Sequence, residues 1–177
     1  KMNFIKKNKL FIIFLMFGFL YSFSSKVFAN NAYYFYQSGE KKLSAGDNYG
    51  AIIDFNKAIF KKDDFANAYI ARCGAKVNIG NNIEAIEDCL KASSLKSNNP
   101  RIFSNICGAM LNLGTYEIAE KFCNQAIDLN NNDGLAYINR GSIKYNSGNI
   151  RGACKDWEKA SNLGYEYASN LKNDYCY

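Results

Sequence analysis

The sequence predicts an all-α protein built from repeated pairs of helices. Four glycines recur at a constant interval of 34 residues, and alanine follows each of them after five and again after twelve residues. The glycines are Gly46, Gly80, Gly114 and Gly148, the first alanines are Ala51, Ala85, Ala119 and Ala153, and the second are Ala58, Ala92, Ala126 and Ala160. Between the alanines stand Phe55, Cys89, Cys123 and Trp157. Three columns in register across four copies, at this period, indicate a helical repeat array.

A second set of positions marks the helix that precedes each of these segments. A small residue lies seven positions before each glycine, at Gly39, Cys73, Cys107 and Gly141. An aromatic residue lies four positions earlier still, at Phe35, Tyr69, Phe103 and Tyr137. Small residues allow two helices to cross closely. We therefore expect this column at the contact between the two helices of each pair.

Together these columns resemble the tetratricopeptide repeat. The second-helix segments read GDNYGAIIDFNKAI, GNNIEAIEDCLKAS, GTYEIAEKFCNQAI and GNIRGACKDWEKAS. The sequence departs from the family at the first-helix tyrosine, which is replaced by Lys42, Lys76, Met110 and Lys144, and in lacking a proline after each second helix. The resemblance covers about three quarters of the chain. It implies a right-handed superhelix of four helix-turn-helix units with a C-terminal capping helix.

The resemblance, together with the N-terminal pattern described below, predicts how the chain is divided. After a signal peptide and a short linker come four repeats and a cap, at residues 1–29, 30–31, 32–65, 66–99, 100–133, 134–167 and 168–177. Beyond Gly164, which is a typical helix stop, apolar residues from Tyr165 to Tyr175 recur at helical spacing. This segment is expected to pack on the second helix of the fourth repeat and to cover Trp157.

The first thirty residues have a different character. Lys6, Lys7 and Lys9 precede an apolar run from residue 10 to about residue 23, and small residues at Val27 and Ala29 suit a cleavage site. This pattern predicts a secretory signal peptide that is cleaved after Ala29. The apolar run is shorter than the roughly 18 residues that a membrane span needs. The expected location is exported, either periplasmic or extracellular, and the alternative is a chain anchored in the membrane by an uncleaved N-terminal segment.

Charge argues against a nucleic-acid partner. The whole chain has a net charge of +6, but five lysines and no acidic residue lie before residue 29. Without them, 17 basic and 16 acidic residues remain. Nucleic-acid affinity depends on concentrated basic charge, so we expect neither nucleic-acid binding nor, unless the leader is uncleaved, membrane association.

The six cysteines are expected to serve structure. In an exported protein disulfides can persist. Folding the cap back about Gly164 brings residue 176 beside residues 152–154, so Cys154 and Cys176 are the best candidates for a disulfide. Cys73, Cys89, Cys107 and Cys123 occupy core columns, where they are either buried thiols or bridges; the sequence leaves their pairing open. No CxxC motif is present, which disfavours a redox enzyme or a zinc ribbon.

Composition disfavours catalysis. The chain has no histidine, which removes the usual general base and the serine and cysteine triads. A metal site would have only cysteine and carboxylate ligands, and the cysteines are widely spaced. Acidic pairs such as Asp63 with Asp64 and Glu87 with Asp88 fit solvated helix surfaces. We therefore expect no enzymatic activity, no cofactor and no metal.

The family resemblance implies a concave groove, lined by the first helices, that binds a protein or peptide of unknown identity. The residues expected to line it are Tyr36, Ile70, Asn78, Arg101, Asn105, Leu111, Asn112, Ile138, Asn139, Tyr145 and Asn146, and Leu43, Val77 and Leu135 face the same way. The asparagines could hydrogen-bond an extended peptide backbone, with Tyr36, Ile70, Ile138 and Tyr145 as apolar anchors. The other interpretation of the asparagines is compositional bias.

Two function classes remain after these exclusions. The first is an exported interaction scaffold that binds a partner in the groove. The second is a disulfide-stabilised structural or stress-related envelope protein without a dedicated ligand. Some members of the family bind a terminal carboxylate in a clamp of basic and amide side chains, and this function is disfavoured here. Among the positions that match the clamp, only Arg101 and Asn105 have suitable donors, and Glu40 would repel the ligand.

Overall fold

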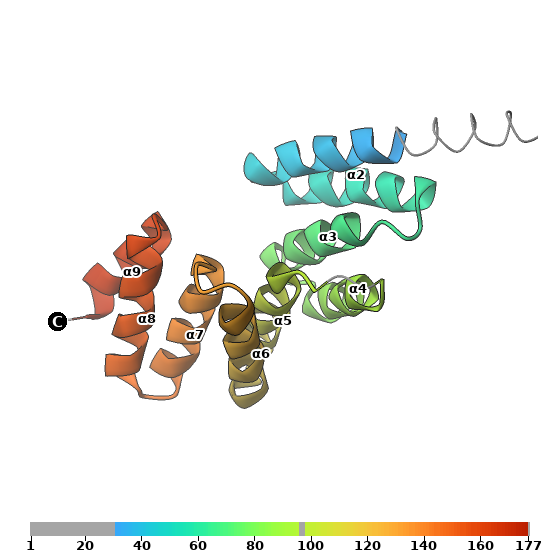
Figure 1. The fold of residues 1–177 in the computed structure, drawn as a ribbon. Coiled ribbons are helices and arrows are strands. Elements are labelled where there is room, and N and C mark those ends of the chain that lie inside the picture. The colour runs from blue at the N-terminus through green and yellow to red at the C-terminus, as the bar shows by residue number, and fades with distance from the viewer. Residues whose placement is uncertain (1–30, 96–97, 177) are drawn as a thin grey trace, which may run out of the picture.

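The computed structural model describes residues 31–95 and 98–176, and all regular secondary structure in these ranges is helical. The predicted signal peptide at residues 1–29 lies outside them. A helix at 31–44 is followed by α2 (Asn48–Lys61), α3 (Ala66–Asn78), α4 (Asn82–Ser94), α5 (Pro100–Asn112), α6 (Tyr116–Leu129), α7 (Gly134–Asn146), α8 (Ile150–Asn162) and α9 (Glu166–Tyr175). The helices stack as successive antiparallel pairs (Figure 1). The predicted all-α array with a terminal helix is confirmed.

The periodic glycines end the first helix of each pair. Gly80 has a backbone φ of +82°, and its N–H donates to the carbonyl of Val77 while the next N–H, of Asn81, donates to that of Lys76. This left-handed closure suits glycine, because other residues pay a steric cost there. The other three repeat glycines and Gly164 share the positive φ. The glycine column therefore reflects a backbone requirement of the turn between the helices.

The position where the two helices of a pair cross is filled in two different ways. In the first and last described pairs a ring lies against glycine, and a Cβ added at Gly39 or Gly141 would come within 2.5 Å of Phe55 or Trp157, respectively. In the two inner pairs the same positions are joined by disulfides, Cys73–Cys89 and Cys107–Cys123, with Cα–Cα distances of 5.6 and 5.3 Å. The open alternative for these four cysteines is thus resolved in favour of bridges.

The last pair is closed by α9. Trp157 is buried beneath it, and its indole N–H donates to the carbonyl of Ile138 at 3.3 Å. The ring of Tyr175, on α9, lies 6.0 Å from the Trp157 ring between centroids. Cys154 and Cys176, the pair expected from the sequence, are joined by a disulfide with a Cα–Cα distance of 5.7 Å. The final helix thus packs on the indole and is covalently tied to α8.

Ion pairs replace the family's first-helix tyrosine in three of the four pairs. The lysine Nζ reaches an aspartate twelve residues later, on the second helix, at 2.6 Å for Lys42–Asp54 and 2.8 Å for both Lys76–Asp88 and Lys144–Asp156. In the third pair these positions hold Met110 and Phe122, and both pack against the same apolar cluster. The two positions therefore change together, from charged to apolar, which accounts for the departure from the family pattern.

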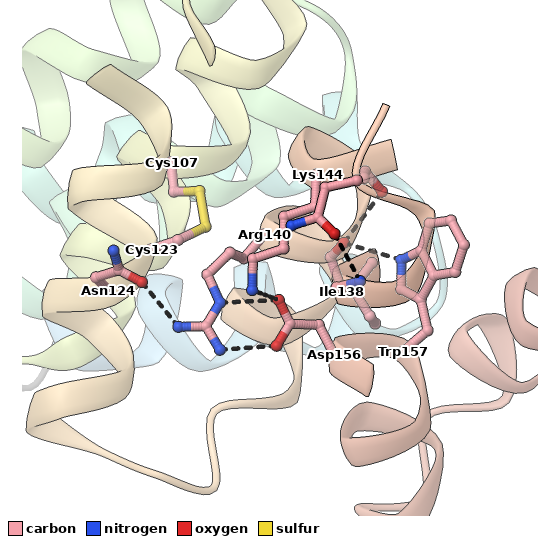
Figure 2. Close-up of polar contacts among 11 residues, drawn as sticks. Cys107, Cys123, Asn124, Ile138, Arg140, Lys144, Asp156 and Trp157 are labelled. Atoms are coloured by element: carbon pink, nitrogen blue, oxygen red, sulfur yellow. Dashed lines mark hydrogen bonds and ion pairs between the residues drawn. A yellow bond between two sulfur atoms is a disulfide. The ribbon is translucent and has the colours of Figure 1, made fainter. Parts of the chain in front are cut away.

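Two arginines extend these ion pairs to the preceding pair of helices. Figure 2 shows Arg140 between Asp156, which it contacts at 2.7 and 2.8 Å, and Asn124 of α6, whose Oδ1 accepts from Nη1 at 2.7 Å. The hydrogen bonds with Asp156 raise the pKa of Arg140, against the effect of burial. Arg72 makes the equivalent contacts to Asp88 and Asn56. Charged groups that are removed from solvent need such partners. Because each arginine bonds an asparagine of the preceding pair, it also joins neighbouring pairs of helices.

Candidate functional site

The first helices of the four pairs line a hollow of about 260 Å³. Five of the residues expected in a groove lie in its wall: Asn78, Arg101, Asn105, Asn112 and Asn139. Apolar surface is added by Leu43 from the helix at 31–44, Val77 from α3 and Leu135 from α7. We call these eight residues, together with Gly74, Ser104 and Gly108, the amide groove. One helix from every pair therefore contributes to it.

Two of the asparagines form the floor of the amide groove. Asn105 is buried, and its Nδ2 donates to the carbonyl of Ile70 at 3.2 Å. Asn139 repeats the contact one pair later, with its Nδ2 donating to the carbonyl of Ser104 at 3.2 Å. Each bond joins the first helix of one pair to that of the preceding pair. These amides therefore have a structural role, and each still has a second N–H and an oxygen.

Two further asparagines stand at the edge of the groove. Asn78 Nδ2 donates to Oδ1 of Asn48 at 2.9 Å, and Asn112 Nδ2 donates to Oδ1 of Asn82 at 3.0 Å. Both contacts run from the end of a first helix to the start of the second helix of the preceding pair. Because Asn78 and Asn112 are exposed, their remaining polar atoms face solvent.

Sequence reasoning missed three residues of the amide groove, Gly74, Ser104 and Gly108. A Cβ added at Gly74 would lie 3.3 Å from Nδ2 of Asn105, and one at Gly108 would lie 3.1 Å from Nδ2 of Asn139. The two glycines thus leave the space into which the floor asparagines reach. Their separation of 34 residues was a signal in the sequence, but nothing there indicated which side chain they accommodate.

Arg101 is the only charged residue among the described residues that line the amide groove. Its side chain is exposed, at the start of α5. Asn105, the other donor expected from the carboxylate clamp, is buried and bonded to the backbone. The groove can therefore offer one cation, amide groups and a few apolar side chains to a ligand. This chemistry suits an extended peptide better than a terminal carboxylate.

The prediction that Ile70 and Ile138 serve as apolar anchors for a ligand is wrong. Their side chains are only 2% and 6% exposed, and each belongs to a core cluster. Ser104, at the equivalent position of α5, lies in the groove wall, whereas Ile70 and Ile138 contribute to the core. The two isoleucines bury apolar surface that stabilises the stack, so they are not available to a ligand.

Four other expected residues do not line the amide groove. Tyr145 packs against Trp157 and Tyr175, with ring centroids 5.7 and 4.9 Å away. Leu111 packs against the core cluster between the third and fourth pairs. Asn146 is exposed at the end of α7, outside the hollow. These positions point toward the cap, the core or solvent.

Tyr36, the fourth of these residues, packs among aromatic rings. Its ring centroid lies 6.0 Å from that of Phe55 and 5.1 Å from that of Phe65. Burial first, and then the negative charge of Glu40, raise the pKa of the Tyr36 phenol. Tyr36 links the first pair to the turn that follows α2, which is a packing role.

Neither a metal cluster nor a membrane span is found in the part of the chain that the structure describes. Within residues 31–95 and 98–176, no group of three or more cysteine, aspartate or glutamate side chains is placed to hold a metal ion. No helix among the same residues has the length and hydropathy to cross a bilayer.

No protein-family model and no curated protein matches the chain. Solved structures do share its fold. A thermophilic tetratricopeptide-repeat (TPR) protein of Thermus thermophilus has a TM-score of 0.68 at 15% identity, over 75% of this chain and 74% of that one. PilF of Pseudomonas aeruginosa has a TM-score of 0.63 at 22% identity, over 76% and 61%. YrrB, described as a TPR protein with an unusual peptide-binding site, has a TM-score of 0.56 at 20% identity, over 76% and 70%. The chain therefore has the tetratricopeptide-repeat fold.

Proposed function

We propose that the protein is a non-enzymatic scaffold of an exported compartment, which binds an extended segment of a partner protein in the amide groove. The observation that carries this proposal is the hollow itself, because all four first helices contribute to it and its wall combines amides, Arg101 and apolar side chains. Amides can bond a peptide backbone without selecting its sequence. The description of YrrB as having a peptide-binding site shows that a protein of this fold can bind a peptide.

Arg101 defines the expected preference for ligand sequence. It is the one charged group among the described residues of the groove wall, and guanidinium groups bind carboxylates with two parallel hydrogen bonds. The partner segment should therefore place an Asp or Glu side chain near the start of α5. Leu135 and Val77, on the neighbouring first helices, supply contacts for small apolar side chains on either side of it.

The disulfides support an exported location, periplasmic or extracellular. All six cysteines are paired in the structure, and two of the bridges are fully buried within helix pairs. Disulfides of this kind persist in oxidising compartments and are rare in the cytosol. The leader-like first 29 residues support the same location. Whether that leader is removed decides between a released and a membrane-anchored form.

Site-specific photo-cross-linking tests the proposed groove. A photoreactive phenylalanine analogue is placed at Leu135, in the amide groove, or at Leu129, a similarly exposed leucine at the end of α6. In cells that export the protein, we expect a discrete cross-linked partner from position 135 alone. Mass spectrometry of the adduct should identify one extended segment that contains an acidic residue.

A second variant shows whether such a cross-link depends on groove chemistry. Arg101→Glu reverses the one charge in the groove wall without altering the core, because the side chain is exposed. With the probe kept at position 135, this change should abolish the adduct. Equal adducts from positions 135 and 129, or an adduct that survives Arg101→Glu, would reject the groove as the binding site.

The second candidate function is a structural or stress-related envelope protein without a peptide ligand. The observation that favours it is the density of cross-links, since three of the four described pairs, together with α9, carry a disulfide. On this alternative, cells should need the bridges but not the groove. A phenotype caused by cysteine replacement and not by Arg101→Glu would support it.

A further inference from the structure

The outward face of α2 carries a stripe of exposed apolar side chains. Tyr49, Ile53 and Phe60 are 70%, 54% and 83% exposed, and their spacing of four and seven residues places them on one side of the helix. Large apolar side chains at this exposure stabilise no core. Ile83 and Leu90 on α4 are also exposed.

The repeat itself does not require this stripe. At the position of Ile53 the later repeats have Glu87, Lys121 and Lys155, and at the position of Phe60 they have Ser94, Asp128 and Asn162. All six of these residues are exposed. Because the same helix forms with polar residues at the same positions, folding does not account for the apolar side chains on α2. Several exposed apolar side chains on one side of a helix favour an interaction site.

The stripe ends at a second apolar feature, beside the start of the helix at 31–44. Phe60 lines a hollow of about 390 Å³ together with Phe35, Lys57 and Lys61. Lys57 Nζ lies 5.4 Å from the centroid of the Phe35 ring. Tyr34, next to Phe35, is exposed, whereas the later repeats have Ala68, Ile102 and Ala136, all buried, at its position. Aromatic rings interleaved with lysines are typical of surfaces that lie at the membrane–water interface.

The length of chain before this helix brings the same surface close to a membrane. The apolar run that ends near residue 23 is separated from residue 31 by only seven residues. Fully extended, this connection spans at most about 29 Å. In Figure 1 the helix at 31–44 runs antiparallel to α2, so its start lies beside the end of α2 that carries Phe60. Whenever the leader occupies a membrane, Phe60 is held within reach of the lipid headgroups.

We propose that, in the form of the protein that keeps its leader, this surface, formed by Tyr34, Phe35, Tyr49, Ile53 and Phe60, contacts the bilayer next to the point where the leader enters it. The stripe from Tyr49 to Phe60 is about 16 Å long at the helical rise per residue, so α2 can lie along the membrane plane. Lys57 and Lys61 flank the rings, and Lys57 is also paired with Asp54 at 3.2 Å. The short connection to the leader favours lipid over a second copy of the chain as the occupant of this surface.

Quenching by brominated lipid tests this contact directly. The full chain carries one tryptophan, which Trp157→Phe removes while keeping a ring of the kind that Phe55 provides at the equivalent position. In that background, F60W and D128W place one tryptophan at equivalent positions of the first and third repeats. Both variants are reconstituted into vesicles of phosphatidylethanolamine, phosphatidylglycerol and phosphatidylcholine with brominated acyl chains. We expect loss of fluorescence in F60W and none in D128W.

A second set of variants shows whether quenching depends on the apolar stripe or only on the tryptophan introduced at position 60. Y49W in the same background reports from the other end of the stripe, and it should lose its quenching when Ile53→Glu and Phe60→Ser remove the apolar contact. Equal fluorescence of F60W and D128W in brominated vesicles would overturn the proposal. So would an unquenched F60W in a chain that sediments as a dimer in unbrominated nanodiscs, because the stripe would then be covered by a second copy.

Discussion

The outer and inner pairs of helices fill the same crossing position by different physical means. In the first and fourth pairs an aromatic ring packs on glycine, Phe55 on Gly39 and Trp157 on Gly141. In the second and third pairs a disulfide occupies the same two positions. A ring stabilises the folded chain through buried apolar surface, whereas a disulfide acts mainly by restricting the unfolded chain. The comparison shows that the repeat requires a filled and close crossing, and that it does not require one particular chemistry.

Because their crossings are filled differently, the inner and outer pairs should respond differently to reduction and to loss of the aromatic ring. A reducing agent removes the link in the two inner pairs, together with the tie between α8 and α9, and leaves the ring-on-glycine contacts in place. Loss of the indole does the reverse, and it also exposes the contact between α8 and α9, where Tyr175 covers Trp157. The predictions below test each kind of crossing.

Trp157→Ala should have the largest effect. The indole is buried, and its N–H is bonded to the carbonyl of Ile138, so truncation leaves a cavity and removes this hydrogen bond. We expect a loss of about 3–5 kcal/mol in the free energy of unfolding, measured by urea denaturation. Tyr167→Ala, at an exposed ring of α9, serves as the control and should change little. An unaltered midpoint in Trp157→Ala would show that the outer crossing is not held by the ring.

Replacing an inner disulfide should have the next largest effect. The disulfide between Cys107 and Cys123 joins residues with a sequence separation of 16. Removing a disulfide that closes a loop of this size lowers the free energy of unfolding by about 3 kcal/mol. The Cys107→Ala/Cys123→Ala variant should lose this amount relative to the oxidised protein, again in urea. Under reducing conditions the difference between the two proteins should shrink. A variant as stable as the oxidised parent would contradict a covalent contribution at this crossing.

Gly141→Ala tests how closely the outer helices approach. The new Cβ would lie 2.5 Å from Nε1 of Trp157, and overpacking of this kind costs about 1–3 kcal/mol. The same change in a Trp157→Ala background meets no ring, and there it should be stabilising, because alanine favours a helix over glycine by up to about 1 kcal/mol. The two changes should therefore be strongly non-additive in thermal or urea unfolding. Additive effects would mean that the ring and the glycine are not in contact.

Asp54 should give the smallest effect, as a pH dependence of the first pair. Burial alone would raise its pKa, but hydrogen bonds from Lys42, Ser38 and Lys57 outweigh it, so the pKa lies below its ordinary value of 3.8. The lowered pKa stabilises the folded chain above the unfolded value, and this contribution is lost as the pH falls through the folded value. We expect the free energy of unfolding to fall below about pH 4, and less steeply in Asp54→Asn. Parallel profiles for the two proteins would show that Asp54 contributes no such dependence.

The sequence predicts the fold well because periodicity acts on whole columns. The turn glycines, the alanines and the crossing residues each repeat four times, so accidental matches are improbable. The Cys154–Cys176 bridge followed from folding one predicted helix about Gly164. In the inner pairs the same columns placed the cysteines together but could not decide between thiols and bridges, because both fill a core position.

The groove could be predicted only in part. Equivalent positions of different repeats can lie in the groove wall or in the core, as Ser104 does in contrast to Ile70 and Ile138. The floor asparagines were recognised as groove residues, but their bonds to backbone carbonyls depend on the spacing between stacked pairs. Gly74 and Gly108 became interpretable only once Asn105 and Asn139 were seen to reach over them. Contacts between repeats are set by the stacking geometry, which no single repeat encodes.

Hydrogen exchange with the bound partner segment tests the central claim most directly. The probe is a synthetic peptide that spans the segment cross-linked from position 135. If the amide groove is the binding site, the peptide should slow amide exchange in α3, α5 and α7 around Asn78, Arg101 and Asn139, and leave α4, α6 and α8 unchanged. Slower exchange confined to α4, α6 and α8, or no change in any helix at saturating peptide, would contradict a groove that binds a partner chain.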